Sequence, residues 1–352
     1  MVKTYLLEKI DESSISPECW GDLLGTGETD TVFLTWHWQY TWWNTFKRGR
    51  LLFIAVECEG RKVALAPLFT ESGMIYFVGS GGSDYLDFIG NTSNPEVMDA
   101  ILERAKDCVP EFLGFRFYHV PDNSQTGVRL QAAANRLGLV CFDEGDLVAP
   151  MLDFSASSKI GFEVTRKKSL LRHEKFFRNE GGLDIRHFTN GEEILSHLNE
   201  FFKQHILRWS QTSCPSLFNN TAQQAFYQKL TETAVNIDWL HFTRIDWEGR
   251  PIAFHFGFFY RKCFFWYKPS FAIDLARRSP GEVLIRQLLL TAISKDADRF
   301  DFGIGDEAFK HRFANQICRV RTWGIYPSKK IFAVHVKENI IYEPCFSFKP
   351  TS

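Results

Sequence analysis

Residues 242–253 read Phe-Thr-Arg-Ile-Asp-Trp-Glu-Gly-Arg-Pro-Ile-Ala, and residues 53–64 read Phe-Ile-Ala-Val-Glu-Cys-Glu-Gly-Arg-Lys-Val-Ala. In each stretch an apolar run leads into a Glu-Gly-Arg turn and then into a second apolar run. Apolar runs that flank a two-residue turn containing Gly are typical of a β-hairpin. The sequence therefore predicts one hairpin in each half of the chain.

Equivalent elements follow both hairpins in the same order. The first half continues with a strand-like run at 74–79, a helix-like segment at 95–106 and a strand-like run at 113–120; the second half continues with 263–267, 281–295 and 300–304. Because one order of elements occurs twice, we expect the fold class to be α/β, with mixed sheets in two tandem domains. Chance similarity is the alternative, since Glu-Gly-Arg turns are common.

The composition suits two well-packed domains. Of 352 residues, 45% are apolar and 15% aromatic, which is enough to bury two sizeable cores. Lys and Arg (41) nearly balance Asp and Glu (42), so the overall charge gives no reason to expect nucleic acid as a partner. The charged segment Met1–Ile10 does not resemble a signal peptide, and no apolar run approaches about 20 residues, so we expect a cytoplasmic protein.

The eight cysteines are scattered along the chain without a CxxC pair. Such spacing fits neither a zinc site nor a small disulfide framework. We therefore expect no metal, and we expect the thiols, such as Cys263, to fill space in the core.

A basic segment separates the two halves. Residues 165–178 have helical character, and Lys168, Arg172 and Lys175 fall three and four apart, on one helix face. This face is either simply solvated or a positive rim for a phosphate-bearing donor or an anionic acceptor. The expected domains are 1–154, a basic linker helix in 155–182, and 183–352.

A strand-to-helix turn in the second half has the composition of an anion site. Residues 276–284 read Ala-Arg-Arg-Ser-Pro-Gly-Glu-Val-Leu. Backbone N–H groups and the positive end of the dipole at a helix start attract phosphate, and a glycine allows a ligand to approach closely. Ser279 is also a candidate N-cap, with Pro280 at the first helical position. The two interpretations are compatible.

A second polar turn follows the last predicted strand. Residues 300–313 read Phe-Asp-Phe-Gly-Ile-Gly-Asp-Glu-Ala-Phe-Lys-His-Arg-Phe, so five charged or titratable residues gather within seven positions. Ligands of α/β sheets bind beyond the carboxyl ends of strands. This bend is therefore either part of a binding site or a surface loop whose charges pair with one another.

At these segments the sequence resembles the branch of the GNAT acyltransferases that includes the CelD-like, cellulose-biosynthesis-associated acetyltransferases. That branch is related to the Fem peptidyltransferases. The motifs that carry the resemblance span about 30–325 of the chain, and are Phe33–Trp38 with Trp42 and Trp43, Asp84–Asp87, His205–Trp209, Phe254–Gly257, Tyr267–Pro269, Arg278–Gly281 and Phe302–Lys310. The resemblance implies two GNAT folds in tandem, with a coenzyme A thioester bound as co-substrate in the second.

The resemblance also implies binding residues. GNAT enzymes hold the coenzyme A pyrophosphate in a loop written R/Q-x-x-G-x-G/A, and here Val283 replaces the final small residue. The implied donor-binding residues are Arg277, Arg278, Ser279, Gly281 and Val283. The corresponding turn of the first half, 79–87, has glycines but no basic residue. We therefore expect that half to shape the acceptor cleft, with Asp84, Tyr85 and Asp87 as substrate residues.

The implied reaction is attack of an amine, or of a hydroxyl as the less favoured alternative, on a thioester carbonyl, helped by holding both reactants in place. Asp306 or Glu307 is the expected base, and Lys310 is expected to steady an oxyanion or an anionic substrate group. His255 is either a base in the cleft or a core histidine. The other expected substrate residues are His205, Arg208, Trp209, Tyr267 and Lys268; His205 and Arg208 either line the cleft from their helix or form a surface pair.

The sequence thus predicts an acyl-CoA-dependent N-acyltransferase whose acceptor is a small-molecule, sugar or lipid amine. A lipid acceptor or a long acyl chain leaves room for peripheral membrane contact. Two alternatives stay open. One is a Fem-like transferase that takes aminoacyl-tRNA as donor, which the neutral overall charge disfavours. The other is a non-catalytic scaffold in exopolysaccharide assembly.

Overall fold

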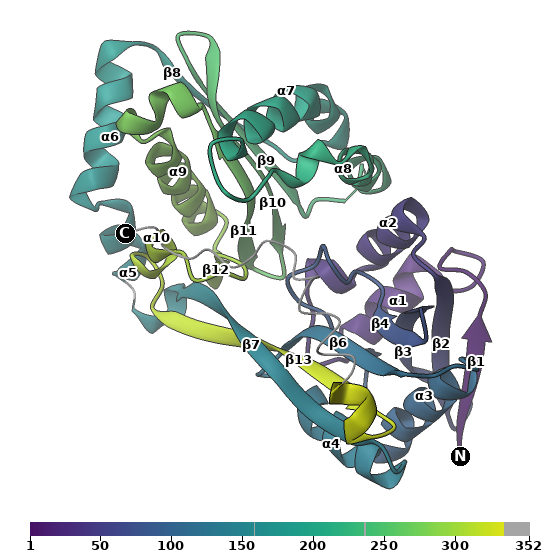
Figure 1. Cartoon of the computed structure of the whole chain (residues 1–352). Helices are drawn as coiled ribbons and strands as arrows, with labels where there is room; N and C mark the ends of the chain where they lie inside the picture. The colour runs from purple at the N-terminus through teal and green to yellow at the C-terminus, as the bar shows by residue number, and fades with distance from the viewer. Residues whose placement is uncertain (158, 236, 334–352) are drawn as a thin grey trace. The chain divides into compact units, whose positions relative to one another are not determined.

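The computed structural model describes residues 1–157, 159–235 and 237–333. The chain divides into two compact units: unit 1 contains residues 1–148 and the part from 318 onward, and unit 2 contains residues 149–317. The chain passes from one unit to the other within two long strands, β7 (Val140–Asp153) and β13 (Gln316–Tyr326) (Figure 1).

The two predicted hairpins are present. They are formed by β2 (Arg50–Cys58) with β3 (Arg61–Glu71) and by β9 (Leu240–Trp247) with β10 (Arg250–Tyr260). In both turns the Glu and the Gly have positive φ angles, 54° and 78° in the first and 53° and 75° in the second. Such turns match the right-handed twist of the paired strands. The repeated Glu-Gly-Arg sequence therefore encodes one backbone geometry twice.

Each unit has the same sheet topology. The strand order is β1-β2-β3-β4-β6-β13 in unit 1, where β5 pairs with β3, and β8-β9-β10-β11-β12-β7 in unit 2. In both, the first three pairings are antiparallel, the fourth is parallel and the fifth is antiparallel. The other strands are β1 (Val2–Leu7), β4 (Met74–Phe77), β5 (Ile89–Gly90), β6 (Gly114–Pro121), β8 (Leu183–Phe188), β11 (Cys263–Phe271) and β12 (Arg299–Asp301). The predicted α/β class with two tandem domains is confirmed.

Helices surround both sheets. Those of unit 1 are α1 (Pro17–Leu24), η1 (Val32–Leu34), α2 (Trp36–Phe46), α3 (Pro95–Asp107) and α4 (Thr126–Arg136). Those of unit 2 are η2 (Phe154–Ala156), α5 (Ile160–Thr165), α6 (Lys168–Glu180), α7 (Gly191–Trp209), η3 (Leu217–Asn219), α8 (Thr221–Thr233), η4 (Ile273–Arg278), α9 (Pro280–Ser294) and α10 (Ala308–His311). The η elements are 3-10 helices.

The sheet of unit 2 is covered on both faces (Figure 1). On one face, Phe201 of α7 contacts Phe242 and Phe254, at 5.8 and 6.2 Å between ring centroids. On the other face, α6 and α9 bury their apolar stripes against strand residues that include Ile245 and Phe264. Each strand thus supplies alternate side chains to two apolar layers.

The basic segment differs in part from the prediction. Residues 165–178 do not form one helix, because α5 ends at Thr165 and α6 begins at Lys168. Leu170 and Phe177 of α6 are fully buried in the core of unit 2, so this helix packs in that unit instead of linking two domains. The unit boundaries also differ from the expected ranges, since residues 318–326 belong to unit 1. Position 158 of the expected linker and positions 334–352 of the expected second domain lie outside the described residues.

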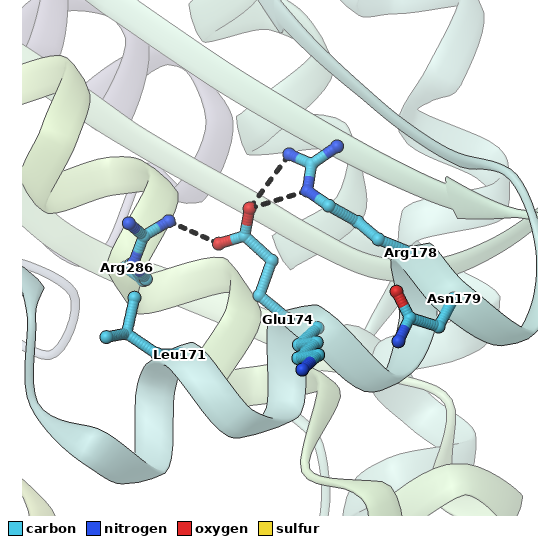
Figure 2. Close-up of a pocket in the computed structure, with 6 residues that line it drawn as sticks. Leu171, Glu174, Arg178, Asn179 and Arg286 are labelled. Atoms are coloured by element: carbon cyan, nitrogen blue, oxygen red, sulfur yellow. Dashed lines mark hydrogen bonds and ion pairs between the residues drawn. The ribbon is translucent and has the colours of Figure 1, made fainter.

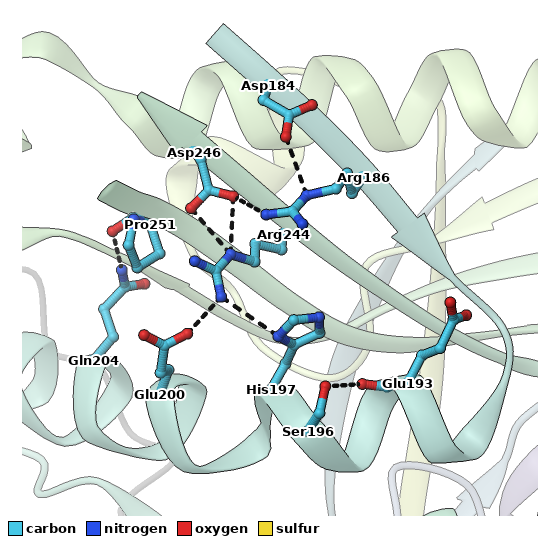
Figure 3. A network of polar contacts seen from close by, with 10 residues as sticks. All are labelled: Asp184, Arg186, Glu193, Ser196, His197, Glu200, Gln204, Arg244, Asp246 and Pro251. Atoms are coloured by element: carbon cyan, nitrogen blue, oxygen red, sulfur yellow. Dashed lines mark hydrogen bonds and ion pairs between the residues drawn. The ribbon is translucent and has the colours of Figure 1, made fainter. Parts of the chain in front are cut away.

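A polar network ties α7 to the sheet at its outer strands (Figure 3). Arg244 donates to Asp246 (2.9 Å) and forms an ion pair with Glu200 of α7, while Arg186 of β8 reaches the same Asp246 carboxylate at 2.5 Å. Burial raises the pKa of Asp246, but the hydrogen bonds from both arginines outweigh this and leave the pKa below its usual value. The network is internally paired, which indicates a structural role.

Candidate active site

The predicted anion-binding turn lies between β11 and α9. Arg277 and Arg278 are exposed in η4, and the Arg278 guanidinium stacks on Phe176 of α6 at 4.3 Å from the ring centroid. Ser279 adopts a left-handed conformation (φ 55°, ψ 55°), and its side chain makes no capping hydrogen bond. The predicted N-cap role of the Ser279 side chain is therefore wrong, and the start of α9 is left without a side-chain cap.

Gly281 and Val283, in the first turn of α9, lie in different surroundings. A Cβ atom at Gly281 would lie 3.3 Å from the ring of Phe271, at the end of β11, so the glycine lets the helix start approach that strand closely. Val283, in contrast, is fully buried in the core. Only the backbone of Val283 is therefore available to a donor.

The bend after β12 depends on glycines. Gly303 and Gly305 have positive φ angles of 68° and 131°, and the Asp301 carboxylate accepts the Gly303 amide at 2.7 Å. A Cβ atom at Gly305 would collide with the Glu307 carboxylate and lie 2.9 Å from Nζ of Lys310. The glycines therefore allow the bend to fold back on its own charged residues.

Lys310 holds this bend together. Its side chain is 4% exposed, and Nζ donates to the carbonyl oxygen of Ile304 (2.9 Å) and pairs with Glu307 Oε2 (2.8 Å). An ammonium group with these internal partners is not free for an oxyanion, so the structure argues against the expected role of Lys310. The neighbouring Asp306 is 76% exposed and lies 2.6 Å from His311 Nε2.

The end of α7 brings Arg208 to the same region. Its guanidinium lies 4.4 Å from the ring centroid of Phe271 and 5.0 Å from that of Trp209. Burial lowers the pKa of Arg208 to about 10, against the opposing effect of the nearby Glu307 carboxylate. The Nε–H group is buried and has no hydrogen-bond partner among the described residues. A buried donor without a partner is unfavourable unless a ligand satisfies it.

His205 lies one turn earlier on α7. It is almost fully buried, and its Nδ1 is 2.8 Å from the Ser216 hydroxyl. Burial, with smaller contributions from Arg208 and Lys268, lowers the pKa of His205 to about 2. His205 therefore supports the wall behind Arg208 as a neutral side chain.

Strand β11 has a bulge just before Lys268, at Tyr267. The β10–β11 register shifts between Phe256 and Phe258, and the Lys268 ammonium lies 3.9 Å from the centroid of the Tyr267 ring. His255 Nε2 accepts the Tyr267 amide at 3.1 Å. His255 has no exposed surface, and burial lowers its pKa to about 3. These contacts fit a core histidine that supports the bulge, not a base that reaches a substrate.

The expected substrate residues of the first half lie in unit 1. The buried Asp87 carboxylate accepts hydroxyl groups of Thr29 and Thr126, both at 2.7 Å, and burial raises its pKa. Tyr85 is also buried, while Asp84 is half-buried. Asp87 thus connects buried side chains within unit 1, a role that the sequence did not predict.

The structure therefore brings together, within unit 2, the helix start at Gly281, Arg208 with its α7 neighbours, and Glu307 in the bend. Phe271 joins these parts, because it contacts Arg208 and lies against Gly281. Sequence reasoning did not identify Phe271; its position at the end of an aromatic-rich strand, just before the basic turn, was the available signal.

Neither a metal site nor a membrane-spanning helix is found in the described ranges. No group of three or more His, Cys, Asp or Glu side chains there could hold a metal ion. No helix in those ranges combines the length and the apolar character that a membrane span needs. The seven described cysteines form no disulfide bond with one another, and Cys345 lies outside the described residues.

Comparisons with known proteins identify a domain family in this part of the chain. Residues 165–311 match the family model described as Acetyltransferase (GNAT) domain. No curated protein matches the sequence. The range of the match contains Arg208, the helix start at Gly281 and most of the bend. The chain therefore carries a GNAT acetyltransferase domain in unit 2, and the protein is an acyltransferase.

Solved structures show the same fold over nearly the whole chain. FemX has a TM-score of 0.66 at 10% identity, over 92% of this chain and 98% of FemX. L-PGS from Bacillus licheniformis has a TM-score of 0.57 at 14% identity, over 96% and 99%. A conserved protein of unknown function from Bacteroides thetaiotaomicron has a TM-score of 0.57 at 12% identity, over 93% and 100%. At these identities the likeness concerns the fold alone.

Proposed function

We propose that unit 2 transfers an acyl group from a coenzyme A thioester to the amine of a small-molecule, sugar or lipid acceptor. One observation carries the proposal. Phe271 contacts the Arg208 guanidinium, with its unpartnered buried Nε–H, and also lies against Gly281 at the uncapped start of α9. The proposed phosphate site at the start of α9 and the proposed carbonyl site at Arg208 are therefore both adjacent to Phe271.

The donor's pyrophosphate would lie at the start of α9. The helix has 15 residues and its first amides lack a side-chain cap, so a phosphate can accept from them and benefit from the positive end of the dipole. The exposed Arg277 and Arg278 add charge at the same end. The resemblance of Arg278–Val283 to the GNAT pyrophosphate loop supports this assignment.

The chemistry would take place beyond the end of the parallel β11–β12 pairing. The acceptor nitrogen attacks the thioester carbonyl carbon, a C–N bond forms, the C–S bond breaks, and the coenzyme leaves as a thiolate that takes up a proton. Glu307 is the proposed acceptor of the proton that the nitrogen loses. Arg208 Nε–H is the proposed donor to the carbonyl oxygen as negative charge develops on it.

The test uses purified protein with acetyl-, medium-chain and long-chain acyl-CoA. We expect at least one thioester to raise the thermal midpoint and, with a panel of amines, to release free coenzyme A thiol. Arg208→Met should lower kcat/KM by about 10²-fold or more, whereas the exposed Arg136→Met of unit 1 should leave it unchanged. An equal loss in both variants, or no loss in either, would contradict the assignment of Arg208.

The alternative donor, aminoacyl-tRNA, has one observation in its favour. Residues 159–180, which include α5 and α6, contain seven Lys or Arg residues and only three Glu residues. Stabilisation by aminoacyl-tRNA, with no response to any acyl-CoA, would establish that alternative in place of the proposed function.

A further inference from the structure

Helices α5, α6 and α9 of unit 2 expose large apolar side chains. Phe162 of α5 is 63% exposed, Leu171 of α6 is 37% exposed, and Leu290 and Ile293 of α9 are 36% and 39% exposed. The apolar core of the unit lies on the opposite sides of these helices. These four residues, named here the apolar ridge, are therefore not needed to fill the core.

The ridge residues are close to one another. A Cβ atom at Gly161 would lie 3.0 Å from Cδ1 of Ile293, which places α5 against the end of α9. Leu290 lies three residues before Ile293, on the same helix face. Leu171 lines an open depression of about 210 Å³ together with Arg286, one helical turn before Leu290 (Figure 2).

Cations border the ridge. The Arg166 guanidinium lies 4.6 Å from the centroid of the Phe162 ring. Lys175, Arg178 and Arg286 line the depression that contains Leu171. The only acid in its lining, Glu174, is buried and paired with both arginines (Figure 2). Lys175 has no ion-pair partner among the described residues and is exposed.

We propose that the apolar ridge and its bordering cations dock on an anionic lipid bilayer. Exposed apolar side chains enter the headgroup region of a bilayer, and Lys and Arg beside them are attracted to anionic phosphates. The chain as a whole has a formal charge of −1, so the attraction is local to this surface. Three of the four ridge residues are aliphatic and offer no ring on which a base could stack, which favours lipid over nucleic acid.

The docking surface is separate from the proposed donor site. Ile293 lies 13 residues after Pro280 in α9, which corresponds to about 20 Å along the helix. A bilayer on the ridge therefore leaves the start of α9 available to a donor.

The experiment is vesicle co-sedimentation of the full chain at low and at high salt. The vesicles are phosphatidylcholine alone or phosphatidylcholine mixed with phosphatidylglycerol. We expect binding to the mixed vesicles, weakened by salt. Arg166→Gln with Lys175→Gln should weaken it roughly 25-fold, at about fivefold for each cation. The matched pair Arg61→Gln with Lys62→Gln, exposed in the unit 1 hairpin, should not weaken it.

The apolar part has its own matched pair. Phe162→Ser should weaken vesicle binding about fivefold or more, and Val128→Ser, 64% exposed in unit 1, should not. The melting curve of each variant shows whether it is folded. The proposal is overturned by no binding to mixed vesicles, by equal binding to both kinds of vesicle, or by equal effects of variants and controls. Binding of tRNA without binding of vesicles overturns it in favour of nucleic acid.

Discussion

Helices α3 and α9 occupy the same place in the two units, because each connects the two strands of the parallel pairing (β4 with β6, and β11 with β12), but they begin differently. In α3, the Asn94 side chain accepts the Glu96 amide at 3.0 Å, and Glu96 adds a carboxylate to the first turn. In α9, Ser279 makes no such bond and two exposed arginines come before it. The first helix start is completed by its own chain, and the second is left open to an anion.

Glu282 in the first turn of α9 does not cancel this difference. Its carboxylate pairs with Arg312 at 2.7 Å and lies 3.6 Å from His173 of α6. The two units thus have the same fold, but the first backbone amides of α3 are capped by a side chain and those of α9 are not. We therefore expect unit 2, and not unit 1, to bind a donor.

The largest expected effect concerns the base. Glu307→Gln should slow thiol release at saturating acyl-CoA by about 10²- to 10⁴-fold, because proton transfer is lost. Acyl-CoA affinity should stay the same. Stopped-flow detection of the thiol, with titration calorimetry for affinity, measures both. Asp306→Asn is the matched control, and a larger loss in that variant would move the base to Asp306.

The next largest effect concerns the stability of the two units at low pH, which should differ. Burial holds the pKa of His255 near 3 and of His205 near 2, and also lowers the pKa of His241, all in unit 2. Their folded pKa values lie below the unfolded value of about 6.5. The unfolded chain therefore binds more protons, and stability falls as pH drops from about 6.5 towards 3.

In unit 1, burial lowers the pKa of His37 to about 4 and also lowers that of His119. Three buried histidines in unit 2, against two half-buried histidines in unit 1, should make unit 2 the more sensitive to acid. We expect the thermal midpoint of the chain to fall by roughly 10 °C or more between pH 7 and about 4.5. His205→Asn should reduce the fall, and the exposed His311→Asn should not. Hydrogen exchange showing that unit 1 opens first would refute this order.

A smaller effect is expected at the basic turn. Arg278→Ala should raise the dissociation constant of acyl-CoA about tenfold, because one charge-assisted contact is lost. The rate at saturation should change little. Titration calorimetry with Arg104→Ala, an exposed arginine of α3, supplies the control. Unchanged affinity in the Arg278 variant would remove that residue from the donor site.

The smallest effect tests the caps directly. Asn94→Ala should lower the free energy of unfolding by about 1 kcal/mol, because it removes a capping hydrogen bond. Ser279→Ala should change it by only about a few tenths of a kcal/mol, since the Ser279 side chain caps nothing. Urea unfolding of both variants gives the two values, and similar losses would remove the difference between the helix starts.

Much of the fold was predictable from local sequence. The Glu-Gly-Arg turns fix both hairpins, and the apolar stripe of residues 284–292 fixes α9, because these signals act between near neighbours. The long strands β7 and β13 were not predicted as the crossings between units, since strand pairing between distant segments leaves no local mark. The basic helix was assigned as a linker, because its charges conceal the buried Leu170 and Phe177.

The candidate site was predictable only as a set of residue types. Arg278, Gly281 and Glu307 stand out by motif. Lys310 donates a hydrogen bond to the carbonyl oxygen of Ile304, and this bond depends on the backbone conformation that two glycines allow. The unpartnered Nε–H of Arg208 is likewise a property of its three-dimensional surroundings.

The open start of α9, and not the capped start of α3, is the proposed binding site of the donor. Amide hydrogen exchange with and without saturating acyl-CoA distinguishes the two helix starts, because the amides of residues 281–283 and 96–98 can be followed in one sample. We expect slower exchange at 281–283 on addition of acyl-CoA and no change at 96–98. Protection at 96–98, or unchanged exchange at 281–283 with acyl-CoA bound, would contradict it.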